Sequence, residues 1–268
     1  ESLYGAGISL KLVGSNYAVQ PGTVRKDDES PLRVYTPFYK RWVNFIGQLP
    51  IEVEIESVSW VAGHGELPEL SQDCTMKIQA SEAYALDTWR MFQKRALRDY
   101  SENRNRTDLS GTSHLSHALA HGEIHPRTLL AELGDSPGEE VFRKELAWRE
   151  FYADVLFHNP HTYDGYYEPR FEKMRYDSAE DNSKLEAWKT GNTGYPIVDA
   201  AMRQLLTTGW MHNRSRMIVA SFLVKDLHIE WQIGARWFEK WLTDFDPASN
   251  SHGWQWTAGC GTDASPYY

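Results

Sequence analysis

Apolar residues recur at a helical period through most of the chain after residue 80. This period predicts helices over residues 82–104, 138–157, 196–209, 211–228 and 232–242, with a further helix opening at residues 111–113. Thr112 offers a capping hydroxyl, Pro196 suits a first helical turn, and Gly209 suits a helix terminus. Residues 81–268 are therefore predicted to form an all-α domain.

The first eighty residues follow a different pattern. Small and β-branched residues cluster around Gly and Pro over residues 6–24, which predicts one or two strands with turns, and a short helix is expected after Pro37. Residues 45–80 are rich in Glu, Pro, Gly and Ser, as a connector is. The predicted organisation is an N-terminal part over 1–44, a connector over 45–80 and a helical domain over 81–268.

The chain is acidic overall, with a formal net charge of −9 and an isoelectric point of about 5.6. This balance disfavours global attraction to nucleic acid, so any contact with DNA needs a local basic surface. One candidate surface has no acidic residue between its ends and carries Arg203, Arg214, Arg216 and Lys225. A second run, which suits a solvated helix face equally well, consists of Arg90, Lys94, Arg95, Arg98, Arg104 and Arg106.

Two cysteines, Cys74 and Cys260, lie far apart and outside any metal-ligand spacing. This argues against a disulfide framework or a zinc site and favours a reducing cytoplasm. We find no apolar run long enough to span a bilayer and no signal-peptide pattern at the start. Nothing in the sequence requires oligomerisation, so a monomer is expected.

Tryptophan is abundant, with 11 residues in 268, several of them beside Asn, Arg or Asp. Large aromatic residues at helical spacing are more often core residues than ligand contacts. Flat aromatic faces with polar neighbours also suit a flat, polar-edged ligand such as a base or a flavin. The composition leaves both interpretations open.

Four segments resemble the DNA photolyase/cryptochrome family in order and spacing: FRKELAWREFY at 142–152, GNTGYPIVDAAMR at 191–203, WMHNR at 210–214, and WQW at 254–256 leading to GTDASPY at 261–267. The resemblance is strongest to bacterial class I cyclobutane pyrimidine dimer photolyases. It implies a mainly α fold, in which 81–268 is a helical FAD-binding domain truncated at its C-terminus. Residues 1–44 would then be a remnant of an N-terminal α/β, Rossmann-like antenna domain, and the chain would be a fragment.

In that family, light-excited reduced FAD passes an electron to a pyrimidine dimer flipped out of DNA, and the dimer splits. The resemblance thus implies a deoxyribodipyrimidine photo-lyase with damaged DNA as its partner, and an antenna chromophore, folate or deazaflavin, in the full-length protein. Two alternatives stay open. One is a cryptochrome-type blue-light receptor that uses the same flavin without repair, and the other is a helical nucleic-acid-binding module without cofactor.

One face of the helix predicted over 138–157 carries candidate lesion contacts, because Glu145, Trp148, Arg149 and Tyr152 are spaced i, i+3, i+4 and i+7. An exposed Glu145–Arg149 ion pair is the simpler interpretation. The resemblance implies more: Trp148 stacks on the dimer, Glu145 bonds its polar edge, and Arg149 serves the flavin or the DNA. It adds Asn213, Met217 and Trp256 to the lesion site, and it gives as DNA contacts Arg104, Glu145, Trp148, Arg149, Tyr152, Asn213 and Arg214. Histidines would replace the pair Asn213/Met217 in a (6-4) enzyme.

The flavin contacts implied by the resemblance come from two regions. A loop matching the family's Thr-Ser-X-Leu-Ser pattern would hold the diphosphate, with Tyr100 as a further contact, and comprises Thr112, Ser113, His114, Leu115 and Ser116. Many relatives have Arg at the position of His114. In the second region Arg216 would pair with Asp244, Asp246 would accept from ribitol or adenine groups, and Asn250 would face flavin N5, where plant cryptochromes have Asp.

The resemblance also implies an electron relay that feeds the flavin. Trp254 and Trp231 match its inner and middle members. The outer member should be a tryptophan about ten residues before Trp188, where this chain offers Tyr176 in a slightly longer loop. Tyr176 is either the terminal donor or a surface residue.

Overall fold

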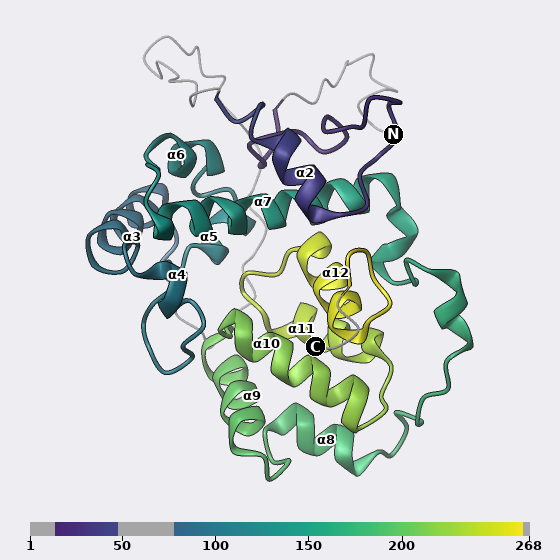
Figure 1. The fold of residues 1–268 in the computed structure, drawn as a ribbon. Helices are drawn as coiled ribbons and strands as arrows, with labels where there is room; N and C mark the ends of the chain where they lie inside the picture. The colour runs from purple at the N-terminus through teal and green to yellow at the C-terminus, as the bar shows by residue number, and fades with distance from the viewer. Residues whose placement is uncertain (1–13, 48–77, 265–268) are drawn as a thin grey trace, which may run out of the picture.

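A computed structural model describes residues 14–47 and 78–264, and the described part is built from helices (Figure 1). The α-helices are α2 (Tyr35–Trp42), α3 (Glu82–Arg95), α4 (Tyr100–Asn103), α5 (Ser116–Ala120), α6 (Pro126–Ala131), α7 (Pro137–His158), α8 (Ser183–Thr190), α9 (Pro196–Thr208), α10 (Asn213–Ser221), α11 (Trp231–Trp241) and α12 (Pro247–Ala258). Two 3₁₀ turns, η2 (Pro160–Tyr163) and η3 (Pro169–Lys173), and a π-helical turn, η4 (Phe222–Asp226), complete them.

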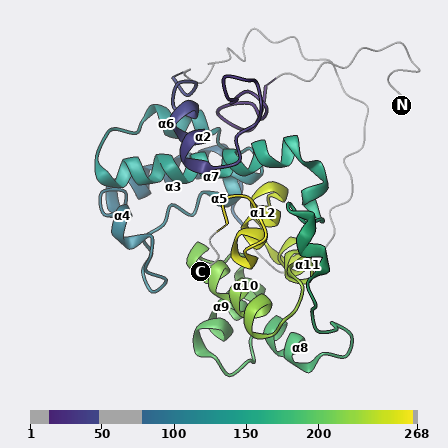
Figure 2. The ribbon, with the colours of Figure 1, turned by 45° about the vertical axis from the view of Figure 1, so that its right-hand side comes forward.

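The helices form two groups around two buried clusters. The first cluster joins α2–α7 to residues 18–32, and the second joins α8–α12. Both views show α7 crossing the molecule between α2 on one side and α12 on the other (Figures 1 and 2). Helix α12 contacts both α7 and α11, so it connects the two groups.

Helix α7 begins at a capping box, in which the Ser136 hydroxyl accepts from the Glu139 amide and the Glu139 carboxylate accepts from the Ser136 amide. Gly138 in its first turn permits a close approach, because a Cβ there would lie 1.8 Å from the Leu97 carbonyl oxygen. Further along, the buried Glu150 carboxylate accepts from the indole N–H of Trp42. These contacts bind both α2 and the α3–α4 turn to α7.

Helix α12 packs closely against α11 because residue 234 is glycine. A Cβ on Gly234 would lie 2.1 Å from Cη2 of Trp254. The Asp246 carboxylate caps α12 by accepting from the Ser249 amide at 2.7 Å, and the helix ends at Gly259 in the left-handed conformation. The start of α12 is thereby fixed beside α10 and α7.

The prediction of a mainly helical domain is confirmed. Several boundaries were wrong: the helix expected over 82–104 breaks after Arg95 where Leu97 meets α7, and the helix expected from 111–113 begins at Ser116 and has five residues. The sequence did not predict α12, because its buried positions include polar ones (Ser251, His252, Gln255 and Thr257) that hide the helical period.

The expected strands over 6–24 are absent from residues 14–24, which form bends and turns; an isolated bridge joins Arg25 to Pro31 just after them. Residues 6–13 and most of the expected connector lie outside the described residues. The short helix after Pro37 is α2, which begins at Tyr35. Whether residues 1–44 continue an α/β domain stays a prediction.

Candidate functional site

A cavity of about 580 Å³ opens between α5, α7, α10 and α12. A smaller hollow of about 130 Å³ adjoins it, deeper between α10, α11 and α12. The walls that both share are formed by Asn213, Arg216, Met217, Asp244, Asp246, Ser249, Gly253 and Thr257. The larger cavity falls in the size range of cofactor pockets.

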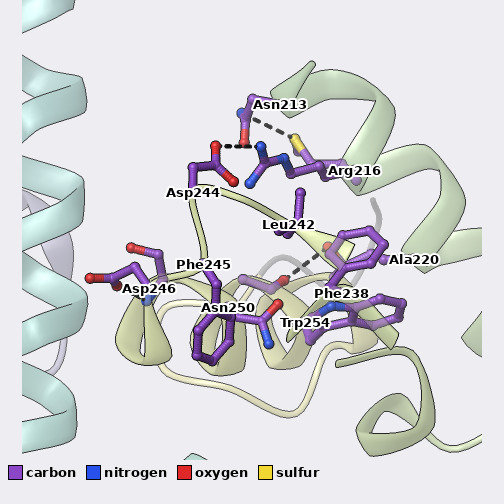
Figure 3. Close-up of a pocket in the computed structure, with 14 residues that line it drawn as sticks. Asn213, Arg216, Ala220, Phe238, Leu242, Asp244, Phe245, Asp246, Asn250 and Trp254 are labelled. Atoms are coloured by element: carbon purple, nitrogen blue, oxygen red, sulfur yellow. Dashed lines mark hydrogen bonds and ion pairs between the residues drawn. The ribbon is translucent and has the colours of Figure 1, made fainter. Parts of the chain in front are cut away.

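Arg216 and Asp244 form the expected ion pair at the wall of this cavity (Figure 3). Arg216 Nη2 donates to Asp244 Oδ2 at 2.7 Å, and Arg216 Nε donates to the Met211 carbonyl at 2.8 Å. The other oxygen, Asp244 Oδ1, is buried and has no hydrogen-bond partner in the structure. A buried unpaired carboxylate oxygen is costly, so this atom is suited to accept from an N–H or O–H of a bound ligand.

Asp246 uses both carboxylate oxygens within the described chain. Oδ1 caps α12, and Oδ2 accepts from the Tyr17 hydroxyl at 3.3 Å. Burial and the neighbouring Asp246 raise the pKa of Tyr17 to about 12, so its hydroxyl stays a donor. The sequence did not indicate Tyr17, because it lies in the segment expected to form strands, more than two hundred residues from Asp246.

Asn250 projects from α12 into the smaller hollow (Figure 3). Its Nδ2 donates to the Ala235 carbonyl of α11 at 3.1 Å. This bond orients the amide and leaves its oxygen as the group that can accept from a ligand. The same hollow is lined by Phe238 and Trp254, which supply flat apolar walls.

Asn213 begins α10, Met217 lies one turn further along it, and both residues line the cavity. Asn213 Nδ2 and Arg214 Nη1 both approach the Met217 sulfur, at 3.9 and 3.1 Å. Arg214 Nε also donates to Asn105 Oδ1 at 2.9 Å. The side chains of this turn are therefore held together at the rim of the cavity.

Glu145 pairs with Arg104 rather than with Arg149. Arg104 Nη1 lies 2.8 Å from Glu145 Oε1, and both side chains are largely buried. Burial raises the pKa of Glu145, and the guanidinium groups of Arg104 and Arg214 oppose that shift. The simple i,i+4 pair weighed from the sequence is thus replaced by a contact between α7 and the residue that follows α4.

The Arg149 guanidinium on α7 joins residue 16 to α5. Its Nη1 and Nη2 donate at 3.1 Å to the carbonyls of Asn16 and Leu119, and the group lies 4.3 Å from the Tyr17 ring centre. Arg149 lines the cavity from this position. It holds residues 16–17 and α5 at the cavity edge, a contact that the sequence did not predict.

Five aromatic residues line the larger cavity: Tyr100, Phe142, Trp148, Tyr152 and Trp256. Trp148 stacks on Tyr35 of α2 with ring centres 3.8 Å apart and an interplanar angle of 6°, which covers one face of the indole. The Trp256 indole donates to the Asp263 carbonyl at 2.9 Å. Tyr35 was not among the sequence candidates, because its part in the site depends on the packing of α2 against α7.

The loop over 112–116 contributes unequally. Ser113 and Ser116 line the larger cavity together with Tyr100. Leu115 is buried in the first cluster, and His114 packs on Trp210 with ring centres 4.5 Å apart. Neither these two residues nor Thr112 lines the cavity, and α5, which follows the loop, has only five residues.

Trp254 and Trp231 are buried together in the second cluster. Trp188 also lies there, with its ring centre 6.2 Å from that of Trp254. The ring of Tyr166 meets Trp231 edge-on at 6.0 Å, and the Tyr166 hydroxyl lies 3.3 Å from that of Tyr176. Tyr176 therefore approaches the tryptophans through Tyr166, which the sequence did not indicate.

The described residues contain no group of three or more His, Cys, Asp or Glu side chains placed to hold a metal ion. None of the described helices combines the length and apolar character needed to cross a membrane. Three residues of the second basic run form ion pairs within the chain: Arg104 with Glu145, Arg106 with Asp108 and Arg90 with Asp87.

Comparison with known proteins links this pocket to a family. Residues 142–268 match the model described as FAD binding domain of DNA photolyase, which confirms the expected cofactor. A deoxyribodipyrimidine photo-lyase of Alkalihalophilus pseudofirmus is 40% identical over 266 residues, 94% of this chain and 55% of that protein. The chain thus spans about half the length of the curated relatives that it matches.

Solved structures agree. A class III photolyase from Agrobacterium tumefaciens aligns with a TM-score of 0.85 and 35% identity over 99% of this chain and 58% of that one. A Synechocystis cryptochrome aligns with a TM-score of 0.80 and 29% identity over 99% of this chain and 59% of that one. The narrower expectation of class I stays a prediction. The chain belongs to the DNA photolyase/cryptochrome family.

Proposed function

We propose that the pocket binds FAD and that the complete protein uses light to repair cyclobutane pyrimidine dimers in DNA. The observation that carries the proposal is the buried Asp244 carboxylate, paired on one side with Arg216 and unpaired on the other, beside the Asn250 amide. Such a wall suits the edge of a flat ring that carries both donors and acceptors.

Residues of this chain would hold the cofactor on two sides. Arg216, Asp244 and Asn250 bind the ring edge, and Asp246 and Arg149 border the ribitol side. The diphosphate would be held by the remaining candidates, Tyr100, Thr112, Ser113, His114, Leu115 and Ser116, of which Tyr100, Ser113 and Ser116 line the cavity. Bound in its reduced form, FAD supplies a light-driven electron to the dimer.

The rest of the cavity accommodates the lesion. Trp148 presents an aromatic face, while Glu145, Asn213 and Met217 supply a polar and polarisable edge and Trp256 closes the opposite wall. The Glu145 carboxylate can accept hydrogen bonds from the N–H groups of a flipped dimer. Arg104, Arg214 and Tyr152 also line the cavity and would contact the DNA there.

The contributions of the chain are orientation, exclusion of water and electrostatics. Asn250 bears an amide where a carboxylate would repel a reduced, anionic flavin, and this favours repair over signalling. Trp254 and Trp231 are buried side chains that carry electrons toward the flavin, with Tyr176 nearest the surface.

The test is repair by the full-length protein. DNA containing thymine dimers is incubated with protein whose flavin has been chemically reduced, and remaining dimers are counted after blue light and after equal time in the dark. The proposal predicts loss of dimers in light and none in the dark. A protein that binds flavin but shows no light-dependent loss of dimers would instead be a receptor. A protein that is purified without flavin would support the alternative of a nucleic-acid-binding module.

A further inference from the structure

The relay lacks a tryptophan at the expected outer position, yet the buried Trp231 touches another oxidisable side chain. Tyr166 is 4% exposed, and its ring meets Trp231 edge-on with centres 6.0 Å apart. Aromatic rings in contact exchange electrons readily. The phenol seen in ring contact with Trp231 is therefore that of Tyr166.

A carboxylate accompanies the phenol. The Tyr166 hydroxyl lies 3.0 Å from Oε1 of Glu230, which directly precedes Trp231 at the N-cap position of α11 and makes no capping hydrogen bond with its side chain. It also lies 3.3 Å from the Tyr176 hydroxyl. A phenol has one hydrogen to donate, and a carboxylate is the stronger acceptor, so Tyr166 donates to Glu230 and can accept from Tyr176.

This arrangement solves the chemical problem of oxidising a buried tyrosine. A tyrosine that loses an electron becomes a strong acid, and in a buried site the released proton needs an acceptor already in place. Burial and hydrogen bonding raise the pKa of Tyr166, so the phenol is protonated before oxidation. Glu230 is only partly buried and can pass the proton to solvent.

We infer that Tyr166, with Glu230 as its proton acceptor, is the electron donor to Trp231; this rests on the proposed function for the relay itself. The oxidant is the indole radical cation left at Trp231 when an electron moves through Trp254 toward photoexcited flavin. One electron passes from Tyr166 to Trp231 and restores its neutral indole. The phenol O–H bond breaks, its proton goes to the Glu230 carboxylate, and a neutral phenoxyl radical remains at Tyr166.

Tyr176 then links this radical to the surface. Its side chain is half-buried within a stretch whose neighbours Arg175 and Asp177 are exposed, and its hydroxyl contacts Tyr166. A thiol in solution can reduce the phenoxyl radical through Tyr176 by giving one electron and one proton. Tyr176 is thus the exit of the path rather than the partner of Trp231.

The experiment follows radicals in the flavin-loaded, full-length protein after a laser flash, by transient absorption and by electron paramagnetic resonance of frozen samples. The inference predicts that an indole radical gives way to a phenoxyl radical and that this conversion is slower in D₂O. Tyr166→Phe should lose the phenoxyl signal and leave a longer-lived indole radical. Glu230→Gln keeps the side-chain volume but removes the acceptor, so it should slow phenoxyl formation.

The matched control is Tyr163→Phe, because the Tyr163 hydroxyl likewise donates to a carboxylate, Glu239, at 2.9 Å, but on the surface. It should retain the full phenoxyl signal. A phenoxyl signal of wild-type size in Tyr166→Phe, or none in the wild-type protein, would overturn the inference. Dimer repair by wild-type protein with chemically reduced flavin bypasses the relay, so it reports on the proposed function separately.

Discussion

At the scale of single residues, the two oxygens of Asp244 have different surroundings. One is neutralised by Arg216 at 2.7 Å, and the other is buried without a partner. Replacing Asp244 with Ala should leave Arg216 unpaired and cost about 1.5–3 kcal/mol of local interaction, so flavin affinity should fall roughly 10–150-fold. Equilibrium dialysis against FAD measures this directly.

The control for Asp244 is Asp27→Ala, which removes a carboxylate paired with Arg41 at 2.9 Å on the surface, where Asp27 is 94% exposed. An exposed pair contributes about 0–1 kcal/mol to stability, and it does not touch the cavity. Flavin affinity should stay as in the wild-type protein. If Asp244→Ala and Asp27→Ala bind FAD with equal affinity, Asp244 does not contribute to flavin binding.

Trp148 lines the cavity and stacks one face of its indole on Tyr35. Trp148→Ala should lose about 1–3 kcal/mol of binding to dimer-containing DNA while weak binding to undamaged DNA changes little, because stacking acts on the flipped base. Fluorescence anisotropy in the dark gives both affinities. Equal losses on the two DNAs would show that Trp148 only supports α2.

His252 is buried between Tyr152 and Thr162, and burial lowers its pKa to about 4 from 6.5. Between pH 6.5 and pH 4 His252 is protonated in the unfolded chain but neutral in the folded chain. The free energy of unfolding is therefore highest above pH 6.5 and decreases as the pH falls to 4. The loss is at most about 3 kcal/mol. Urea unfolding at several pH values in this range should show the decrease in the free energy of unfolding. His252→Gln should make that free energy depend less on pH, whereas replacing the exposed His161 with Gln should not.

At the scale of elements, the contact between α11 and α12 sets the position of the site. Gly234→Ala would place a Cβ 2.1 Å from Trp254 and 2.7 Å from Leu223, which should destabilise the protein by about 1–3 kcal/mol. Gly253→Ala in α12 meets nothing within 4 Å and should be neutral or stabilising by about 0.5–1 kcal/mol. Denaturant unfolding of flavin-free protein separates the two, and equal stabilities would contradict the close packing of α11 on α12.

Helices with one buried face could be predicted from the sequence, as α9 shows. Helix α12 could not, because it is buried on several sides and carries polar residues inward. The break after Arg95 depends on Gly138, more than forty residues away, so no local pattern marks it. The period of apolar residues therefore predicts helices with one face in solvent, and it misses a helix such as α12 that has polar residues at buried positions beside the site.

The candidate site divides in the same way. Motif residues that contact each other within α10–α12, such as Arg216 and Asp244, lie where the sequence placed them. Contacts that depend on residues 14–47, namely Tyr17 with Asp246 and Tyr35 with Trp148, were not predicted. They required knowing that this segment packs on α7.

At the scale of the whole molecule, the two helix groups meet at α12, and the cavity lies where they meet. One wall comes from α7 with Trp148 and Glu145, and the opposite wall comes from α10–α12 with Arg216 and Asn250. A flavin on the second wall would thus face a lesion on the first. We propose that light-driven electron transfer takes place across this cavity.

The most direct test is the excited-state lifetime of reduced flavin in the full-length protein, measured at saturating DNA. Dimer-containing DNA should shorten the lifetime, because an adjacent lesion accepts the electron, and undamaged DNA of the same sequence should leave it unchanged. Trp148→Ala, saturated with the same damaged DNA, should restore part of the longer lifetime. An identical lifetime with damaged and undamaged DNA, both fully bound, would contradict the account.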